Sequence, residues 1–229
     1  MEKKDYILIV ISSTALIISI TSLIITLVQK NKEVKRTIRK TLSDTLEGIA
    51  RINIEVTKSR GEDFNSEKNI LLRRNYNTQR HILIAHADTL VQNYDSIVKE
   101  IDCKILAEAH SSIGDYDAAK IYWEKATHKS QSGSIKMMTL RGYAMFLFGN
   151  GEVEEGRKIF NEAINIKLKD TDENKIILAD TYLMLCDMEK GIDTDNFESS
   201  LLKAMEIWHS IKNKNTKEDI YARINLRRK

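Results

Sequence analysis

A pattern of glycine, small and aromatic residues occurs twice in this chain, and the two copies lie 37 residues apart. The first copy consists of Gly114, Tyr116, Ala119, Trp123 and Ala126. The second copy consists of Gly151, Val153, Gly156, Phe160 and Ala163. In each copy the glycine can adopt the positive φ that ends one helix, and the last three residues of the copy then share one face of a second helix. A hairpin repeated at this period buries its apolar face only by stacking, so the pattern predicts an all-α solenoid of helical hairpins.

The same positions resemble the tetratricopeptide repeat family. Its repeat of about 34 residues is a helix–turn–helix with Gly and Tyr at the turn, then Ala, an aromatic residue and Ala on the second helix. The first copy has this spacing without a gap, whereas in the second copy Val153 replaces the tyrosine and Gly156 the first alanine. The late proline of the family is missing, because the chain contains no proline. The resemblance is clear over residues 100–166, and it implies a TPR-like repeat domain over residues 63–229.

A third, weaker unit follows the two clear copies. Cys186 continues the pattern of a first helix, a turn begins at Gly191, and Ser200 and Ala204 supply the small residues of a second helix. A short helix after Asn213 is expected to cap the stack.

An uncharged run of 22 residues extends from Ile7 to Val28 and is rich in isoleucine and leucine. As a helix it is about 33 Å long, and the hydrocarbon core of a membrane is about 30 Å thick. A cleaved signal peptide is the alternative, but its apolar region is shorter and ends at a small-residue cleavage site. We therefore expect a retained transmembrane helix over residues 7–28.

Basic residues follow this run directly and are opposed only by Glu33. They are Lys30, Lys32, Lys35, Arg36, Arg39 and Lys40. Because an excess of Lys and Arg marks the cytoplasmic side, the chain is expected to be a single-pass membrane protein with residues 1–6 outside and the rest in the cytoplasm. The basic residues are then expected to lie on the surface of the lipid bilayer.

Residues 29–62 are expected to form an amphipathic helix. Its apolar residues recur every three or four positions: Val34, Ile38, Leu42, Leu46, Ile49, Ile52 and Val56. The stripe either packs on the domain that follows it or joins copies of the chain in a short parallel coiled coil, since Leu42, Ile49 and Val56 have heptad spacing.

The pattern breaks over residues 60–65, which are the best candidate for a linker, and Ser66 is placed to cap a further helix. That helix, within residues 66–98, has a broad apolar face. Three cations between the apolar positions are expected to face water: Arg73, Arg74 and Arg80.

The sequence carries little sign of catalytic or nucleic-acid chemistry. The net charge of +3 arises mainly from residues 30–40 and not from a basic face of the repeats. His81 and His86 lack the spacing and the glutamate of a zinc motif, and His110 occupies a core position where a structural histidine is expected. Cys103 and Cys186 are expected to be buried thiols. We therefore predict no enzyme activity, cofactor, metal or nucleic-acid partner.

The first helices of a stacked array line its concave surface, and the resemblance implies that this groove binds partner proteins. The groove positions of the family correspond in this chain to Lys104, Glu108, Ser111, Arg141, Met145 and Phe148. Lys104 and Arg141 are equivalent cations 37 residues apart, although both also suit a solvated surface. Glu108 stands where the members that bind C-terminal carboxylates need an asparagine, so that specificity is not expected.

Three functions are compatible with these features. The first is a membrane-tethered adaptor whose repeats dock cytosolic proteins. The second is a membrane scaffold whose copies self-associate through residues 32–58 and the repeats as a homo-oligomer. The third is a regulatory module that acts through a partner enzyme encoded elsewhere.

Overall fold

The structure is a computed structural model that describes residues 3–58 and 66–228, with side chains from Ser19 onward except that of Lys68. Within these ranges every regular element is a helix, which confirms the predicted all-α class. The helices form two compact units, Met1–Val98 and Lys99–Lys229. The second unit therefore begins later than residue 63, where the sequence placed the start of the repeats.

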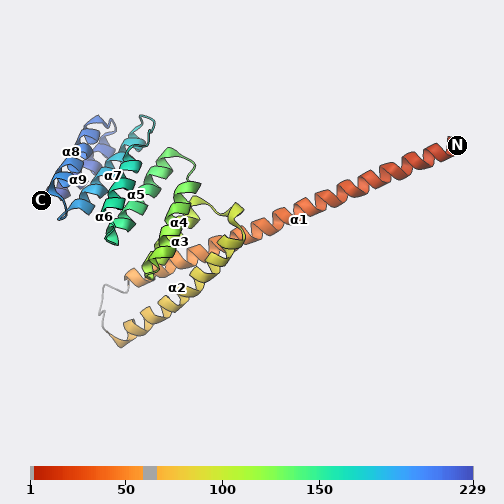
Figure 1. Cartoon of the computed structure of the whole chain (residues 1–229), viewed down its shortest axis with the longest axis horizontal. Coiled ribbons are helices and arrows are strands. Elements are labelled where there is room, and N and C mark those ends of the chain that lie inside the picture. Colours follow the sequence, from red (N-terminus) through yellow and green to blue (C-terminus); the bar gives the residue numbers. More distant parts are fainter. Residues whose placement is uncertain (1–2, 59–65, 229) are drawn as a thin grey trace. The chain divides into compact units, whose positions relative to one another are not determined.

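The first unit is a pair of long helices, α1 (Lys3–Lys58) and α2 (Glu67–Asn93), followed by a short 3-10 helix, η1 (Asp95–Ile97) (Figure 1). The two long helices pack on each other in antiparallel directions. Thr45 Oγ1 lies 3.4 Å from His86 Nδ1, and a Cβ added at Gly48 would lie 3.1 Å from Leu83 Cδ1. From the first contact to the second, the residue number rises by three on α1 and falls by three on α2, so the two helices run in opposite directions.

The apolar stripe predicted on residues 29–62 is buried only in its middle. Leu42, Leu46, Ile49 and Ile52 are buried, whereas Val34 is 46% exposed. Because α1 packs on α2 over this region, the buried part of the stripe packs within the first unit.

No helix in the part of the chain that the structure describes has an apolar stretch long enough to cross a membrane. The predicted transmembrane helix over residues 7–28 is therefore wrong, and the single-pass localisation with an outside N-terminus is wrong with it. The uncharged run with described side chains extends from Ser19 to Val28. Its length is about 15 Å, half of the roughly 30 Å that a span requires. The side chains of residues 7–18 lie outside the described residues.

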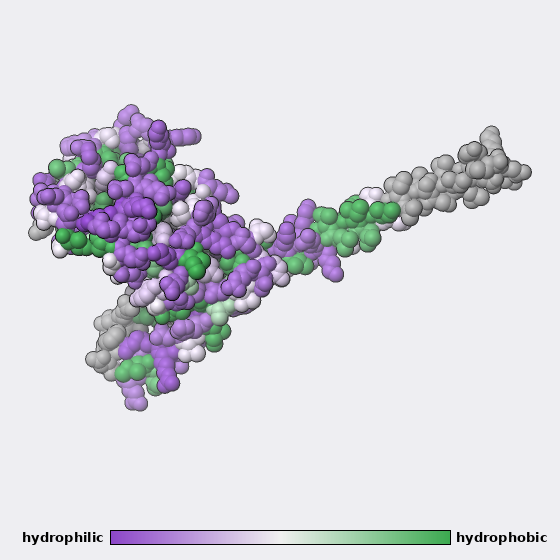
Figure 2. Space-filling model, viewed as in Figure 1, coloured by the Kyte–Doolittle hydropathy of each residue, from purple (hydrophilic) through white to green (hydrophobic). Residues whose placement is uncertain are grey.

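Hydrophobic residues gather on α1 next to the undescribed side chains, as Figure 2 shows. Six of them are exposed by about half or more: Ile20, Leu23, Ile24, Ile25, Leu27 and Val28.

The start of α2 agrees with its sequence signal, because the Ser66 side chain accepts a hydrogen bond from the amide of Asn69. The predicted linker over residues 60–65 lies outside the described residues. One of the three α2 cations is placed differently from the prediction. Arg74 is exposed and Arg73 is half-buried, but Arg80 is only 6% exposed. Arg80 shares a helix face with the buried Ile84 and Ala87, four and seven residues later, so its long stem is buried with them.

The second unit contains three helical hairpins and a final helix, in chain order and side by side (Figure 1). The elements are α3 (Glu100–Ser112), α4 (Tyr116–Lys129), α5 (Gly133–Gly149), α6 (Val153–Ile164), α7 (Asp172–Glu189), α8 (Thr194–Ser210) and α9 (Lys214–Arg227). The closest packing occurs within the pairs α3–α4, α5–α6 and α7–α8, and α7 also packs on α5. The first helices of the second and third hairpins are therefore neighbours.

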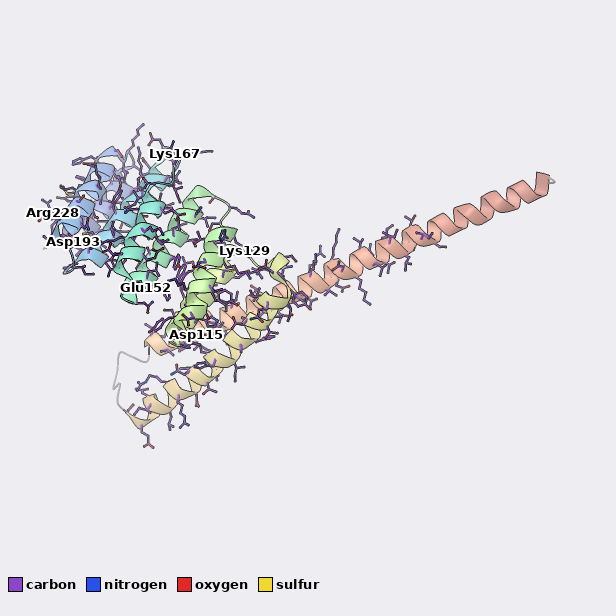
Figure 3. The ribbon with its side chains drawn as sticks, in the orientation of Figure 1. Asp115, Lys129, Glu152, Lys167, Asp193 and Arg228 are labelled. Atoms are coloured by element: carbon purple, nitrogen blue, oxygen red, sulfur yellow. The ribbon has the colours of Figure 1, made fainter. Side chains whose placement is uncertain are left out.

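Each hairpin turns at a glycine with a positive φ. The values are 81° at Gly114, 82° at Gly151 and 83° at Gly191, a backbone region that residues with a Cβ rarely adopt. Asp115, Glu152 and Asp193 then begin the second helices, and they lie along one edge of the array in Figure 3, opposite Lys129 and Lys167.

The first turn is further tied by a histidine. The predicted structural role of His110 is confirmed, because this buried residue near the end of α3 places its Nδ1 3.0 Å from Asp115 Oδ2 and stacks its ring on Tyr122 of α4. Asp115 also accepts the amide hydrogen bond of Ala118, so one carboxylate caps α4 and holds the histidine.

The small and aromatic residues of the repeat pattern face the core, as predicted. Ala119, Trp123 and Ala126 are buried on α4, and Gly156, Phe160 and Ala163 are buried on α6. Ser200 and Ala204 are buried on α8. Tyr116 is the exception among the residues of the first copy that follow the turn, since it is 53% exposed.

Ion pairs connect each hairpin to the next at equivalent places. Lys120 Nζ on α4 lies 2.7 Å from Glu152 Oε2 at the start of α6. Arg157 follows Lys120 by 37 residues, and its Nη2 lies 3.6 Å from Asp193 Oδ2 at the start of α8. Arg157 also donates two hydrogen bonds, of 2.7 and 2.8 Å, to the buried carboxylate of Glu189 at the end of α7.

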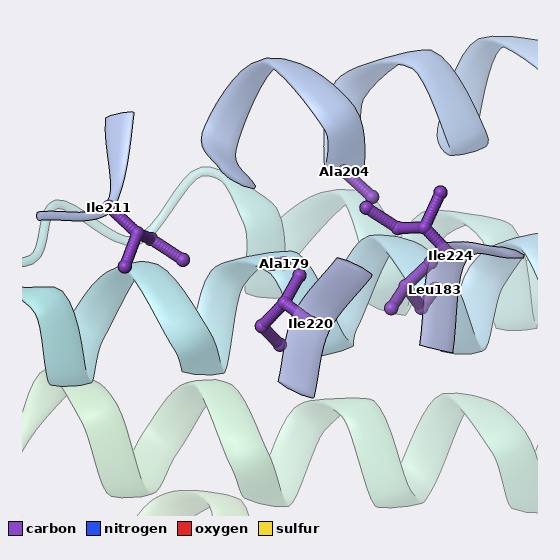
Figure 4. Packing of buried hydrophobic residues seen from close by; sticks show 6 residues of the cluster. All are labelled: Ala179, Leu183, Ala204, Ile211, Ile220 and Ile224. Atoms are coloured by element: carbon purple, nitrogen blue, oxygen red, sulfur yellow. The ribbon is translucent and has the colours of Figure 1, made fainter. Parts of the chain in front are cut away.

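The final helix closes the array, as the sequence predicted. Ile220 and Ile224 of α9 are buried together with residues of α7 and α8, and Figure 4 shows this cluster: Ala179, Leu183, Ala204, Ile211, Ile220 and Ile224. Arg223 and Arg227 of α9 pair with Asp180 and Asp187 of α7.

Candidate functional site

A groove of the second unit runs over the first helices of the three hairpins. Its cavity has a volume of about 610 Å³. Fourteen residues line it: Lys104, Glu108, Ser111, Ser112, Tyr116, Trp123, Met138, Arg141, Gly142, Met145, Phe146, Gly149, Asn150 and Met184. Neighbouring first helices therefore form a common concave surface, the geometry that a repeated hairpin dictates.

Five of the six groove residues inferred from the sequence lie together in this cavity: Lys104, Glu108, Ser111, Arg141 and Met145. The sixth, Phe148, does not line it. Phe148 is 8% exposed and packs in the core on Phe160, with ring centroids 5.9 Å apart. Its ring turns inward because Gly156 leaves space beside it on α6.

Sequence reasoning missed three residues on the apolar side of the groove: Met138, Phe146 and Met184. Met138 lies three residues before Arg141 and Met145 four residues after it, so helical spacing from Arg141 was a signal for Met138. Met184 gave no local signal, because its place depends on how α7 packs beside α5.

The charged side of the groove combines cations and one carboxylate. Lys104 and Glu108 are one turn apart on α3, and Arg141 lies on α5. The Glu108 side chain is exposed in the groove, but the groove walls displace part of the water around its carboxyl and so raise its pKa, and the charge of Lys104 opposes this shift. Burial likewise lowers the pKa of Arg141, and the charge of Asp180 opposes that shift.

Arg141 is not fully satisfied by the protein. Its Nη1 atom is buried and has no hydrogen-bond partner among the described residues. A guanidinium stays charged in proteins and offers several donors, so a buried nitrogen without an acceptor can bind an anionic ligand group.

The apolar side of the groove adapts to different shapes. Met138, Met145 and Met184 have flexible, polarisable side chains that repack around varied ligands. Trp123 forms a rigid part of the wall, because Gly142 allows its ring to lie against α5. A Cβ at Gly142 would lie 2.7 Å from Trp123 Cη2. The groove can therefore contact apolar side chains and an acidic group at the same time.

Titratable residues elsewhere offer no comparable arrangement in the described ranges. No group of three or more His, Cys, Asp or Glu side chains is placed there to hold a metal ion. His81 is exposed, and His86 contacts Thr45. Cys103 and Cys186 are both buried, and burial raises the pKa of Cys186 to about 11, so this thiol stays protonated at neutral pH.

The basic residues predicted to lie on a membrane surface are on α1. Lys30, Lys32, Lys35, Arg36 and Lys40 are exposed, and Arg39 is half-buried. Their predicted role required the transmembrane helix before them, so it is withdrawn with that helix.

Comparisons of the chain with protein-family models, with curated proteins and with solved structures found no match.

Proposed function

We propose that the second unit is a protein-interaction module of the tetratricopeptide repeat type, and that its groove binds a segment of a partner protein. The proposal is supported most directly by the convergence of Lys104, Arg141 and Met145 in one groove, as the repeat spacing predicted. A surface with separate cationic and apolar parts is suited to recognising a peptide segment by both kinds of contact.

The geometry of the array supports the same function. The hairpins are held to one another by ion pairs and by the buried faces of α4, α6 and α8, so the groove is a preformed surface. Preorganisation of this kind reduces the entropy that is lost on binding.

A site-specific crosslink tests the proposal. A photoreactive amino acid at position 145 in the full-length chain is expected to crosslink a distinct protein in cells. The matched control carries the same amino acid at Leu202, which is 59% exposed on α8 outside the groove. Combining the probe at 145 with Lys104→Glu and Arg141→Glu should remove the crosslinked band. An identical band from position 202, or one that survives both charge reversals, would refute binding in the groove.

Self-association of the first unit is a second candidate function. Large apolar side chains are exposed on α2, among them Ile70, Leu71 and Ile82, which are 50%, 53% and 64% exposed. Surfaces of this kind often bind another protein, and a second copy supplies a matching surface. Sedimentation of the full-length chain and of a Leu71→Glu, Ile82→Glu variant tests it. A wild-type chain that sediments as a monomer would exclude this function.

A further inference from the structure

We propose that Arg141 binds an aspartate or glutamate side chain within an apolar part of the partner segment, and that Arg223 of α9 keeps Arg141 available by holding Asp180. This inference rests on the proposed function and specifies the chemistry of the bound segment. It assigns a binding role to Arg141 and a positioning role to Arg223, which lies on α9 and outside the groove lining.

Arg141 has the properties of an anion-binding residue. It makes no ion pair among the described residues, and its buried Nη1 has no acceptor. Met138 and Met145 lie on either side of it along α5, and all three line the cavity. An anion bound here would be partly shielded from water, where a charge-assisted hydrogen bond is stronger than on an open surface. The planar guanidinium also matches the two oxygens of a carboxylate.

Asp180 is the residue of this unit that competes for Arg141. It precedes Met184 by four residues on α7, so the two share a helix face, and Met184 lines the cavity. The charge of Asp180 also acts on Arg141. Asp180 Oδ1, however, accepts a hydrogen bond of 2.8 Å from Arg223 Nη1. The carboxylate whose charge acts on Arg141 is thus held by α9.

The position of Arg223 is fixed by the packing of α9. Ile220 and Ile224, on either side of Arg223, are buried in the cluster with α7 and α8. Arg223 also pairs with Asp219 at 2.6 Å, and Arg227 donates a hydrogen bond of 2.7 Å to Asp187. These contacts leave α9 little freedom to withdraw Arg223 from Asp180.

For a segment that contains an Asp or Glu, the charge pattern favours an internal position of that residue over the last position of the chain. A chain that ends in an acidic residue brings two negative charges, and Glu108 already places one carboxylate beside Lys104. A single Asp or Glu between apolar residues brings one charge for Arg141 and side chains for the methionines.

The test uses two labelled peptides with blocked ends, one with a single glutamate between leucines and a twin with glutamine in its place. The full-length chain should bind the glutamate peptide about tenfold more tightly than its twin. Arg141→Gln should remove this preference, and Arg141→Lys, which keeps the charge, should retain part of it. Lys136→Gln is the matched control, because Lys136 lies on α5 and pairs with Glu162 outside the groove.

The role of Arg223 is tested with the same pair of peptides. Arg223→Gln should free Asp180 to pair with Arg141 and lower the preference for glutamate several-fold, without changing binding of the glutamine twin. Adding Asp180→Asn should restore the preference. A merely structural role would weaken binding of both peptides alike, which would overturn the inference for Arg223.

The outcomes separate this inference from the function on which it rests. Equal binding of the two peptides by the wild-type chain, or no binding of either, would overturn the role of Arg141. The crosslink from position 145 would still report whether the groove binds a protein.

Discussion

Gly156 and Phe148 are complementary in size: a Cβ on Gly156 would lie 2.5 Å from Cδ2 of the Phe148 ring and 2.9 Å from its Cε2. The equivalent residues of the first hairpin, 37 positions earlier, are Ala119 and Ser111. Compared with the first hairpin, the second hairpin therefore has a larger residue on its first helix, Phe148, and a smaller residue on its second helix, Gly156. The exchange explains why Gly156 replaces the alanine of the repeat pattern and why Phe148 is buried.

Replacing Gly156 with alanine should therefore destabilise the protein, although alanine is the better helix former. The added methyl group overpacks the contact with Phe148, so we expect the free energy of unfolding to fall by about 1–3 kcal/mol. Urea unfolding of the variant measures this loss. In a Phe148→Ala background the same Gly156→Ala change should cost clearly less, because the ring contact is gone and the contact of 3.2 Å with the Ala144 carbonyl oxygen remains. An equal loss in both backgrounds would contradict the size complementarity.

The repeat pattern allowed much of the second unit to be predicted. Gly114 and Gly151 signalled the turns because a glycine with a positive φ commonly ends a helix, and Trp123 and Phe160 signalled the buried faces because small residues flank them at helical spacing. Five of the six groove positions followed from the same register, whereas Phe148, the equivalent of Ser111, turns into the core.

The predictions that failed depended on contacts that no local pattern encodes. Phe148 was misplaced because its orientation depends on the missing Cβ of Gly156 on another helix. Arg80 was misplaced because a helix face with a cation among apolar residues can bury the stem of that cation. The run over residues 7–28 was interpreted from hydropathy and length alone, and that interpretation did not hold in the described residues.

Arg157 and Glu189 form the contact between hairpins that should matter most for stability. The Glu189 side chain is 1% exposed, and both of its oxygens accept hydrogen bonds from Arg157. Arg157→Met would leave a buried carboxylate without its cation, which should lower the free energy of unfolding by about 3–5 kcal/mol. The double variant Arg157→Met, Glu189→Met should recover most of the loss, because neither charge is then buried alone.

Lys158→Ala is the control for this pair in urea unfolding. Lys158 is the next residue on α6 and pairs with Glu155 at 3.3 Å on an exposed surface, so its removal should change stability by less than about 0.5 kcal/mol. Similar losses for Lys158→Ala and Arg157→Met would show that the burial of Glu189 has no special importance.

The connection before α9 should weaken in acid because it depends on Asp172. Hydrogen bonds from the amides of Asn213 and Lys212 hold the pKa of Asp172 below its ordinary value. A carboxylate with a lowered folded pKa stabilises the native state above the unfolded pKa of about 3.9, and this contribution is lost as the pH falls through the folded pKa. Protection of the Asn213 amide from hydrogen exchange should therefore decrease in that range.

Asp172→Asn provides the comparison for the acid experiment. This variant should show weaker protection of the Asn213 amide at neutral pH and no further loss between about pH 4 and the folded pKa of the wild-type carboxylate. The amide of Leu183, inside α7, reports on the stability of the array as a whole. If the protection of Leu183 falls together with that of Asn213, the acid effect is global and Asp172 is not its cause.

Glu108 should oppose the binding of an acidic segment in the groove, because it shares the cavity with Arg141 and Lys104. Glu108→Gln keeps the shape of the side chain, removes the charge and leaves Lys104 free to attract the ligand. The affinity for the glutamate peptide should rise by about two- to fivefold, as expected for one exposed charge, and the affinity for the glutamine twin should stay unchanged.

Glu198→Gln, on the exposed surface of α8, should change neither value. Weaker binding of the glutamate peptide by the Glu108→Gln variant would mean that Glu108 supports the bound segment, and the assignment of this side of the groove to anionic ligands would then be wrong.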